Sequence, residues 1–512
     1  MARARRAAGR RRAGRVALAA TTRPETPRNG RYEPVYTAGY TRAVTLLLMA
    51  AYTFNSMDRS IISIIAQSMK VDLALTDTQV GLLGGTAFGI LYALGGIPIA
   101  RLAERFNRVN IIAMALISWS ALTALLGAAA GFAQLLAIRV SIGVAEAGCS
   151  PPAHSLLSDY VVPERRASAL SIYSCGISLG YILGAVIGGW VALHYGWRAA
   201  CVTVGLPGIA MALVIRTLVR EPPRGHSEPA TVRATASGPT PFSMRHELAE
   251  LGAVARALLL NWPVLNVILG VTIGSFAAYG SYQFVPAFFS RAYGLDYATI
   301  GLVSGFAGGV SVGIGIFTGG FIADALARRS RRWYALVPAI GTALAVPFYV
   351  LAFLQPDWKS AAVILSIPGF FQYASLGPTF GIVQNVVDSR RRATASALLY
   401  ICLSVLALGG GPLFTGWVID RLAEGHFTDL VHGGTLSAGS FQLACPGGTA
   451  APRATAELAR ACAESLTAAT RQGLVITVLL YCWSALHYLL AAVGIGRVLE
   501  EAATRRAASA AA

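Results

Sequence analysis

The sequence predicts an all-α, polytopic membrane protein with twelve transmembrane helices in two six-helix bundles. Of its 512 residues, 55% are hydrophobic and 13% are charged, which is too apolar for a protein surrounded by water. Apolar runs of about 20 residues, the length that a helix needs to cross the hydrocarbon core, recur from Thr45 to Val493. Connections in the first half of the chain also have counterparts in the second half, which indicates a duplicated bundle.

The apolar runs give twelve predicted spans. In chain order they are 44–68, 78–100, 109–130, 133–157, 168–193, 199–219, 262–289, 298–323, 333–354, 360–387, 394–419 and 472–494. The corresponding domains are an N-terminal six-helix bundle (44–219), C-terminal helices 7 to 11 (261–420) and helix 12 (472–499). Between and beyond them we expect a disordered basic cytoplasmic tail (1–43), a cytoplasmic linker (220–260), a long periplasmic loop (421–471) and a cytoplasmic tail (500–512).

Arginine clusters predict the orientation of the chain. They follow spans 2, 4, 8 and 10, at Arg105 and Arg108, at Arg165 and Arg166, at 328–332 and at 390–392. The connection around Gly131, on the other side, carries no charge. Because positive loops stay inside, both termini are predicted to be cytoplasmic in a bacterial inner membrane. The same rule accounts for the net charge of +18 without a nucleic-acid partner.

The two halves share sequence motifs around these clusters. After span 2 the chain reads "GGIPIARLAERFNR" (95–108), and after span 8 it reads "GGFIADALARRSR" (319–331). After span 4 it reads "PERRASALSIY" (163–173), which matches "SRRRATASALLY" (389–400) after span 10. Two related bundles joined by a flexible linker are typical of transporters that expose a central site to each side in turn.

These motifs resemble a known family. "GGIPIARLAERFNR" is similar to the cytoplasmic loop signature of the major facilitator superfamily, and "RVSIGVAEA" (139–147) to its fourth-helix signature. "NSMDR" in span 1, "LVREPPRG" after span 6 and "SLGPTFGIVQNVV" in span 10 look like its Spinster-like branch of sphingolipid and lysophospholipid transporters. The resemblance, to a bacterial member, implies a monomeric, proton-driven transporter with an amphipathic, lipid-like cargo.

Four charged side chains lie inside the predicted spans, where ionisable groups are costly and are functional candidates. Asp58 and Arg59 lie in span 1, and Arg139 and Glu146 lie in span 4. Arg139 and Glu146 are seven residues apart, so they face the same way about 10 Å apart along the helix. Asp58 and Arg59 are adjacent and point about 100° apart, so one of them would face span 4 and the other the second bundle.

Two interpretations of these charges stay open. In the first, two buried ion pairs hold spans 1 and 4 together. In the second, Asp58 or Glu146 takes up and releases a proton, while Arg59 or Arg139 pairs with the acid in one state and with an anionic cargo in another. In the Spinster-like branch, the acids that match Asp58 and Glu146 are implicated in proton coupling.

Polar and aromatic side chains of the second half are predicted to line the substrate cavity. They are Tyr282, Gln283, Tyr373 and Gln384, and the alternative is that they pack between helices or face lipid. A second group at the cytoplasmic helix ends is predicted to latch the two bundles in an outward-facing state, the alternative being simple orientation by positive charge. It comprises Glu104, Arg105, Arg108, Asp324 and Arg328.

Cys445 and Cys462 lie in the long outer connection, where an oxidising compartment would allow a disulfide; two free thiols are the alternative. The sequence contains no metal-ligand spacing, phosphate-binding glycine loop or nucleophile triad. We therefore predict no cofactor, no metal site and no catalytic residue, and the chain is not expected to be an enzyme.

The sequence as a whole predicts a proton-coupled secondary active transporter that moves an amphipathic anion of lysophospholipid or sphingoid type across the inner membrane by alternating access. Its expected partners are this small molecule, protons and membrane lipids. One alternative is a proton-coupled transporter of small organic acids or drug-like compounds, because the fold does not determine the cargo. Another is a membrane receptor that binds without transporting.

Overall fold

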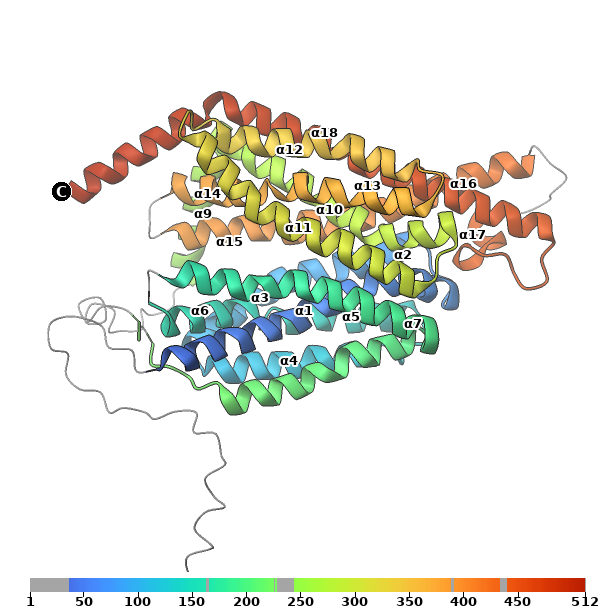
Figure 1. Cartoon of the computed structure of the whole chain (residues 1–512), viewed down its shortest axis with the longest axis horizontal. Coiled ribbons are helices and arrows are strands. Elements are labelled where there is room, and N and C mark those ends of the chain that lie inside the picture. Colours follow the sequence, from blue (N-terminus) through green and yellow to red (C-terminus); the bar gives the residue numbers. More distant parts are fainter. Residues whose placement is uncertain are drawn as a thin grey trace, which may run out of the picture.

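The computed structural model describes residues 36–162, 165–224, 226–227, 244–387, 391–432 and 440–511. Over these residues the chain is almost entirely helical and contains no strand. Figure 1 shows two bundles side by side, with α1–α7 in one and α10–α18 in the other. The prediction of an all-α membrane protein is confirmed.

The first bundle crosses the membrane six times. Its helices are α1 (Ala38–Asp72), α2 (Asp77–Gly81), the π-helical segment η1 (Leu82–Thr86), α3 (Ala87–Arg105), α4 (Arg108–Leu126), α5 (Phe132–Glu146), α6 (Ser150–Tyr160) and α7 (Arg166–Leu218). Segments α2, η1 and α3 form one crossing, and α5 and α6 form another. The helix α7 makes two crossings because Gly196, with φ +83°, breaks it in the left-handed region that glycine tolerates.

The second bundle also crosses six times. It contains α9 (Met244–Leu259), α10 (Trp262–Tyr293), α11 (Tyr297–Ala327), α12 (Trp333–Phe353), α13 (Trp358–Tyr373), α14 (Leu376–Val386), α15 (Arg392–Ile401), the π-helical segment η4 (Cys402–Leu408), α16 (Gly409–His432), α17 (Phe441–Ala444), the short 3₁₀ segment η5 (Pro446–Gly448) and α18 (Ala456–Ala511). The crossings are α10, α11, α12, α13 with α14, α15 with η4 and α16, and α18. The helix α9 precedes them.

Three predicted segments differ from the structure. The loop predicted over 421–471 is helical in large part, because α16 continues to His432 and α18 begins at Ala456. The linker contains α9, and α18 continues through the predicted C-terminal tail. Apolar content marks the part of a helix that lies in lipid, whereas alanine, glutamate and arginine can extend a helix beyond it. Most of the predicted N-terminal tail lies outside the described residues.

The bundles approach each other closely at one end. We call the end that holds Cys445 and Cys462 the disulfide end, and the end where α7 finishes and α9 begins the linker end (Figure 1). At the disulfide end, a Cβ atom added to Gly85 of η1 would lie 2.5 Å from the carbonyl oxygen of Leu408 in η4. A Cβ on Gly81 would lie 2.2 Å from the carbonyl oxygen of Pro412. Glycines therefore let backbone pack against backbone there.

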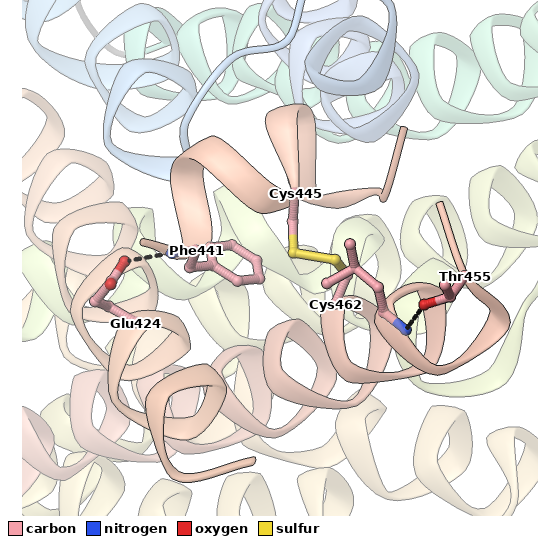
Figure 2. Close-up of a disulfide and its surroundings, with 6 residues drawn as sticks. Glu424, Phe441, Cys445, Thr455 and Cys462 are labelled. Carbon is pink, nitrogen blue, oxygen red and sulfur yellow. Dashed lines mark hydrogen bonds between the residues drawn. A yellow bond between two sulfur atoms is a disulfide. The ribbon is translucent and has the colours of Figure 1, made fainter. Parts of the chain in front are cut away.

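The structure joins Cys445 and Cys462 in a disulfide, beside the hydrogen bond from the Phe441 N–H to Glu424 (Figure 2). Cys445 and Pro446 are followed by Gly447 and Gly448, whose φ angles are +68° and +86°. A Cβ on Gly447 would lie 2.8 Å from the carbonyl oxygen of Lys70 in α1. This cross-linked segment of the second bundle, residues 440–448, therefore rests on the first bundle, and we call it the cap.

Removing the disulfide is expected to loosen the cap. A cross-link over a separation of 17 residues restricts the unfolded segment, and its loss costs about 3 kcal/mol in the chain-entropy model. The combined substitution Cys445→Ser and Cys462→Ser should speed amide hydrogen exchange across 440–448. Reduction of the parent should do the same, and replacing the exposed Cys482 with serine should not. Unchanged exchange in the double variant would contradict the expectation.

Candidate functional site

The four predicted intramembrane charges form two ion pairs between α1 and α5. In the first pair, Arg59 Nε donates to Glu146 Oε2 over 2.9 Å, and Asn55 Nδ2 donates to the same oxygen over 2.9 Å. The other carboxylate oxygen of Glu146 and the Nη2 atom of Arg59 are buried without a hydrogen-bond partner. The guanidinium also lies over the rings of Phe88 and Tyr92, at 4.8 and 4.7 Å from their centroids. This pair therefore keeps unused hydrogen-bonding capacity.

The second pair is more completely enclosed. Arg139 Nη1 lies 3.4 Å from Asp58 Oδ2, and both side chains are 2% exposed. Thr123 donates a hydrogen bond to the other oxygen of Asp58, and Arg139 Nε donates to the carbonyl oxygen of Leu83 over 3.2 Å. Every contact of this pair lies inside the first bundle. Asp58 and Arg59 do have different partners, as predicted, but both partners are on α5.

A central cavity of about 240 Å³ lies between the two bundles. The first bundle contributes Tyr52, Arg59 and Tyr181 to its wall, and the second contributes a larger set that includes Tyr279 and Tyr373. Arg59 is the one charged side chain among the described residues that line it, and its side chain is 24% exposed. The rest of the described lining is uncharged and combines aromatic and apolar side chains with serine, threonine and glutamine, so Arg59 is the point at which a ligand anion would bind.

Of the four predicted cavity residues, two lie at the cavity and two do not. Tyr373 lines the central cavity, and Tyr282 lines a smaller chamber next to it. Gln283 was predicted wrongly, because it is buried against Gly84 of the first bundle. Gln384 was also predicted wrongly, because it is exposed and donates to Ser396 over 3.0 Å. It lies 11 residues beyond Tyr373, or about 16 Å along a helix, towards the linker end.

Sequence reasoning missed Gln372, the neighbour of Tyr373. Its Oε1 atom accepts hydrogen bonds from the hydroxyls of Tyr349, over 2.9 Å, and Tyr481. The residue lines both the central cavity and the neighbouring chamber. A glutamine inside an apolar helix, within "FFQYAS", was the available signal, since a buried amide needs partners.

Arg108, one of the predicted latch residues, makes its ion pairs within the first half of the chain. This arginine is fully buried and binds Asp159 over 2.5 Å and Glu221 over 2.6 Å, both of which belong to the first half of the chain. Asp324 accepts from Tyr334 within the second bundle over 2.8 Å. Arg105 and Arg328 are exposed, and the side chain of Glu104 lies outside the described ones. The guanidinium of Arg108 is therefore held inside the first bundle, and the latch, which was predicted for an outward-facing state, stays a prediction.

Replacing Arg108 with alanine is therefore expected to destabilise the first bundle rather than to change gating. Two carboxylates would lose a buried cation, which costs about 3–5 kcal/mol for a broken buried pair. The melting temperature of the purified protein should fall clearly. Arg105→Ala, at an exposed position on the same loop, should change stability by less than about 0.5 kcal/mol and is the matched control. Equal melting temperatures for both variants would refute this assignment.

A charged cluster at the disulfide end was not predicted. Arg291 of α10 forms two hydrogen bonds to Asp77 of α2, over 2.6 and 3.1 Å, and thereby joins the two bundles. Lys70 Nζ of α1 lies 2.6 Å from the same carboxylate. Asp420 of α16 accepts from the backbone N–H groups of Asp77 and Thr78 over 3.0 and 2.7 Å. Lys70 and Asp77 are 1% and 0% exposed.

These charges escaped notice because they lie just beyond the apolar runs that define spans 1, 2, 7 and 11. We call Lys70, Asp77, Arg291 and Asp420 the disulfide-end cluster. The cap covers it, because a Cβ on Gly448 would lie 3.6 Å from Lys70 Nζ.

In the part of the chain that the structure describes, no group of three histidine, cysteine or acidic residues could hold a metal ion.

Comparison with known proteins gives a consistent result. The family model of the Major Facilitator Superfamily matches residues 48–412. An MFS-type efflux pump of Mycolicibacterium smegmatis is 31% identical, covering 73% of this chain and 83% of that protein. A hexuronate transporter of Bacillus subtilis is 25% identical, covering 76% and 91%. A bacterial homologue of the human lysosomal transporter Spinster, solved in an inward-facing and unoccupied conformation, has a TM-score of 0.76 and 31% identity, covering 91% and 99%.

Proposed function

Because the chain belongs to the Major Facilitator Superfamily, in its Spinster-like branch, and is therefore a multi-pass membrane transporter and not an enzyme, we propose that it carries an amphipathic anion in exchange for, or together with, protons. The favoured cargo is a lipid-like molecule of lysophospholipid or sphingoid type. The membrane is the bacterial inner membrane, with both termini in the cytoplasm, and the working unit is a monomer.

One observation carries this proposal. Arg59 is shared between the central cavity and Glu146, and its Nη2 atom has no hydrogen-bond partner. A guanidinium can bind a phosphate or carboxylate through two parallel hydrogen bonds, so the unused and buried Nη2 group would suit an anionic cargo once the side chain turns towards the cavity. The aromatic wall opposite supports an apolar cargo body.

The cargo anion and the Glu146 carboxylate would then compete for one arginine. When the cargo anion binds Arg59, the guanidinium turns away from Glu146, and the carboxylate loses its main cationic partner. A carboxylate without a partner in a site of low polarity takes up a proton, because an isolated buried charge is costly. Asp58, fully enclosed with Arg139 and Thr123, would hold α1 and α5 in register and serve as a second coupling acid.

The close packing at the disulfide end suggests which way the cavity opens. We assign this end to the periplasm and the linker end to the cytoplasm, so the conformation is inward-facing. The similarity to an inward-facing Spinster homologue supports the same assignment. Alternating access would then require the disulfide-end cluster to separate.

A small organic acid is the second candidate cargo. The similarity to a hexuronate transporter supports it, and Arg59 would bind a sugar carboxylate as well as a lipid phosphate. The two candidates would make different contacts with the aromatic wall, because a sugar acid would hydrogen-bond through its hydroxyl groups, whereas a lipid would pack through its apolar chain.

The test is proton movement in liposomes that contain the purified protein and a pH-sensitive dye. Lysophospholipids, sphingoid phosphates and small organic acids are added in turn, with Glu146→Gln as the control. A lipid class that moves protons with the parent and not with the variant supports the proposal. Proton movement with organic acids alone supports the second candidate. If labelled cargo crosses without protons, the coupling is refuted, and if nothing crosses while cargo binds, the protein is a receptor.

A further inference from the structure

A side chamber lies next to the central cavity, inside the second bundle. It has a volume of about 80 Å³ and is enclosed by α10, α11 and α13, with Tyr349 of α12 and Tyr181 of α7. The chamber and the central cavity share six residues in their walls, namely Tyr181, Ala278, Tyr279, Val312, Gln372 and Tyr373. The two spaces therefore adjoin at these six residues.

The chemistry of the chamber differs from that of the central cavity. Its described lining contains no charged residue, and small or apolar side chains such as Val285, Ala307, Gly308 and Leu365 make up much of the wall. A charged headgroup would lose its hydration there without gaining a partner. A hydrocarbon chain would gain favourable burial, roughly in proportion to the area removed from water.

Gln372 marks the boundary between the two spaces. The residue is 9% exposed, and its Oε1 atom already accepts from two tyrosine hydroxyls. These two bonds fix the carboxamide and leave its Nε2 group to donate to a ligand at the junction.

The far wall of the chamber is thin. Ala307 and Ser311 line the chamber and also line a groove on the outer surface between α11 and α13. Phe306 and Ile314, which also line this groove, are 57% and 50% exposed, which in a membrane-spanning helix predicts contact with lipid. The chamber therefore extends from the central cavity towards the lipid, and two small side chains separate it from the groove.

From these observations we infer that the side chamber is the subsite for the end of the cargo's apolar chain. The anionic group lies at Arg59, the chain passes Gln372 at the junction, and its last few CH₂ groups enter the chamber towards Ala307 and Ser311. This inference rests on the proposed function, because it assumes an amphipathic anion. It adds a prediction that the proposed function does not make, namely that the chamber sets the preferred length of the chain.

Gly308 allows the chamber to be filled without disturbing the fold. A Cβ atom at this position would lie 3.8 Å from Cε2 of Tyr282, an ordinary van der Waals contact, so Gly308→Leu extends into the chamber. Gly320 is on the same helix, and a Cβ there would meet no atom within 4 Å. Gly320→Leu is therefore the matched control for the larger side chain and for any change in helix propensity.

The experiment measures how acyl-chain length affects binding. Parent and variants are mixed with equal amounts of octanoyl and myristoyl lysophosphatidylglycerol, and the bound species are counted by native mass spectrometry. The parent and Gly320→Leu should prefer the myristoyl probe by roughly tenfold or more, because the longer chain buries more CH₂ groups. Gly308→Leu should bind the octanoyl probe as the parent does and lose this preference.

Each other outcome has a defined meaning. If Gly308→Leu keeps the full preference, or the parent has none, the chamber is not the chain subsite, and the proposed function still stands. If the parent binds neither probe but binds a hexuronic acid, both the amphipathic cargo and the chain subsite are refuted. If Gly320→Leu loses the preference as well, the effect does not come from the chamber, and the inference fails.

Discussion

Replacing Arg59 with methionine is expected to destabilise the protein by about 3–5 kcal/mol and to abolish binding of anionic amphiphiles. The substitution leaves Glu146, which is 0% exposed, with Asn55 as its remaining hydrogen-bond donor. It also removes the one cation that lines the central cavity among the described residues. Thermal unfolding and native mass spectrometry with a lysophosphatidylglycerol would measure the two effects separately.

Adding Glu146→Gln to Arg59→Met separates structure from function. The amide needs no cation, so the double variant should recover most of the lost stability, while the cavity still lacks its guanidinium and binding stays lost. Glu146→Gln alone should keep binding and lose pH-driven uptake. If the double variant recovers binding together with stability, the pair is purely structural, and the proposed role of Arg59 is wrong.

Replacing Asp77 with alanine should open the disulfide end. Lys70 and Arg291 would keep two buried positive charges without the carboxylate between them, and the loss of about 3 kcal/mol from the closed state shifts its population by roughly 150-fold. Spin labels at positions 195 and 354, which are exposed on different bundles, should report a new, longer distance.

The matched control is Asp72→Ala. Asp72 pairs with Arg198 within the first bundle, and both side chains are 45% exposed, so the variant should lose less than about 1 kcal/mol and keep the parent's distance. A lower melting temperature for Asp77→Ala without any change in the label distance would mean that the disulfide-end cluster stabilises the fold but does not gate it.

The sequence predicted the helices and the four central charges well, for a common physical reason. Apolar runs of membrane length are typical of transmembrane helices. Charges inside such runs are rare, which singles out Asp58, Arg59, Arg139 and Glu146. Helical spacing also separated the partners of Asp58 and Arg59, although it did not place both partners on α5.

The remaining site depended on contacts between distant segments. Gln283 and Gln384 were plausible from composition, but the rotation of α10 and the position of Gln384 near the linker end turn them away from the cavity. Arg108 looked like a surface cation and proved to be buried against Asp159 and Glu221. These two partners lie 51 and 113 positions from Arg108, so local sequence pattern cannot reveal them.

The pairing of two acids with two arginines between α1 and α5 also has an electrical consequence. The four formal charges of this group cancel. When the empty carrier changes conformation, these four side chains therefore move no net charge through the membrane field. A cargo with one negative charge, accompanied by one proton, would keep that sum at zero. A cargo with two negative charges would leave one uncompensated, and the membrane potential would then act on it with about 2.3 kcal/mol per 100 mV. Voltage sensitivity of transport would thus report the charge of the cargo.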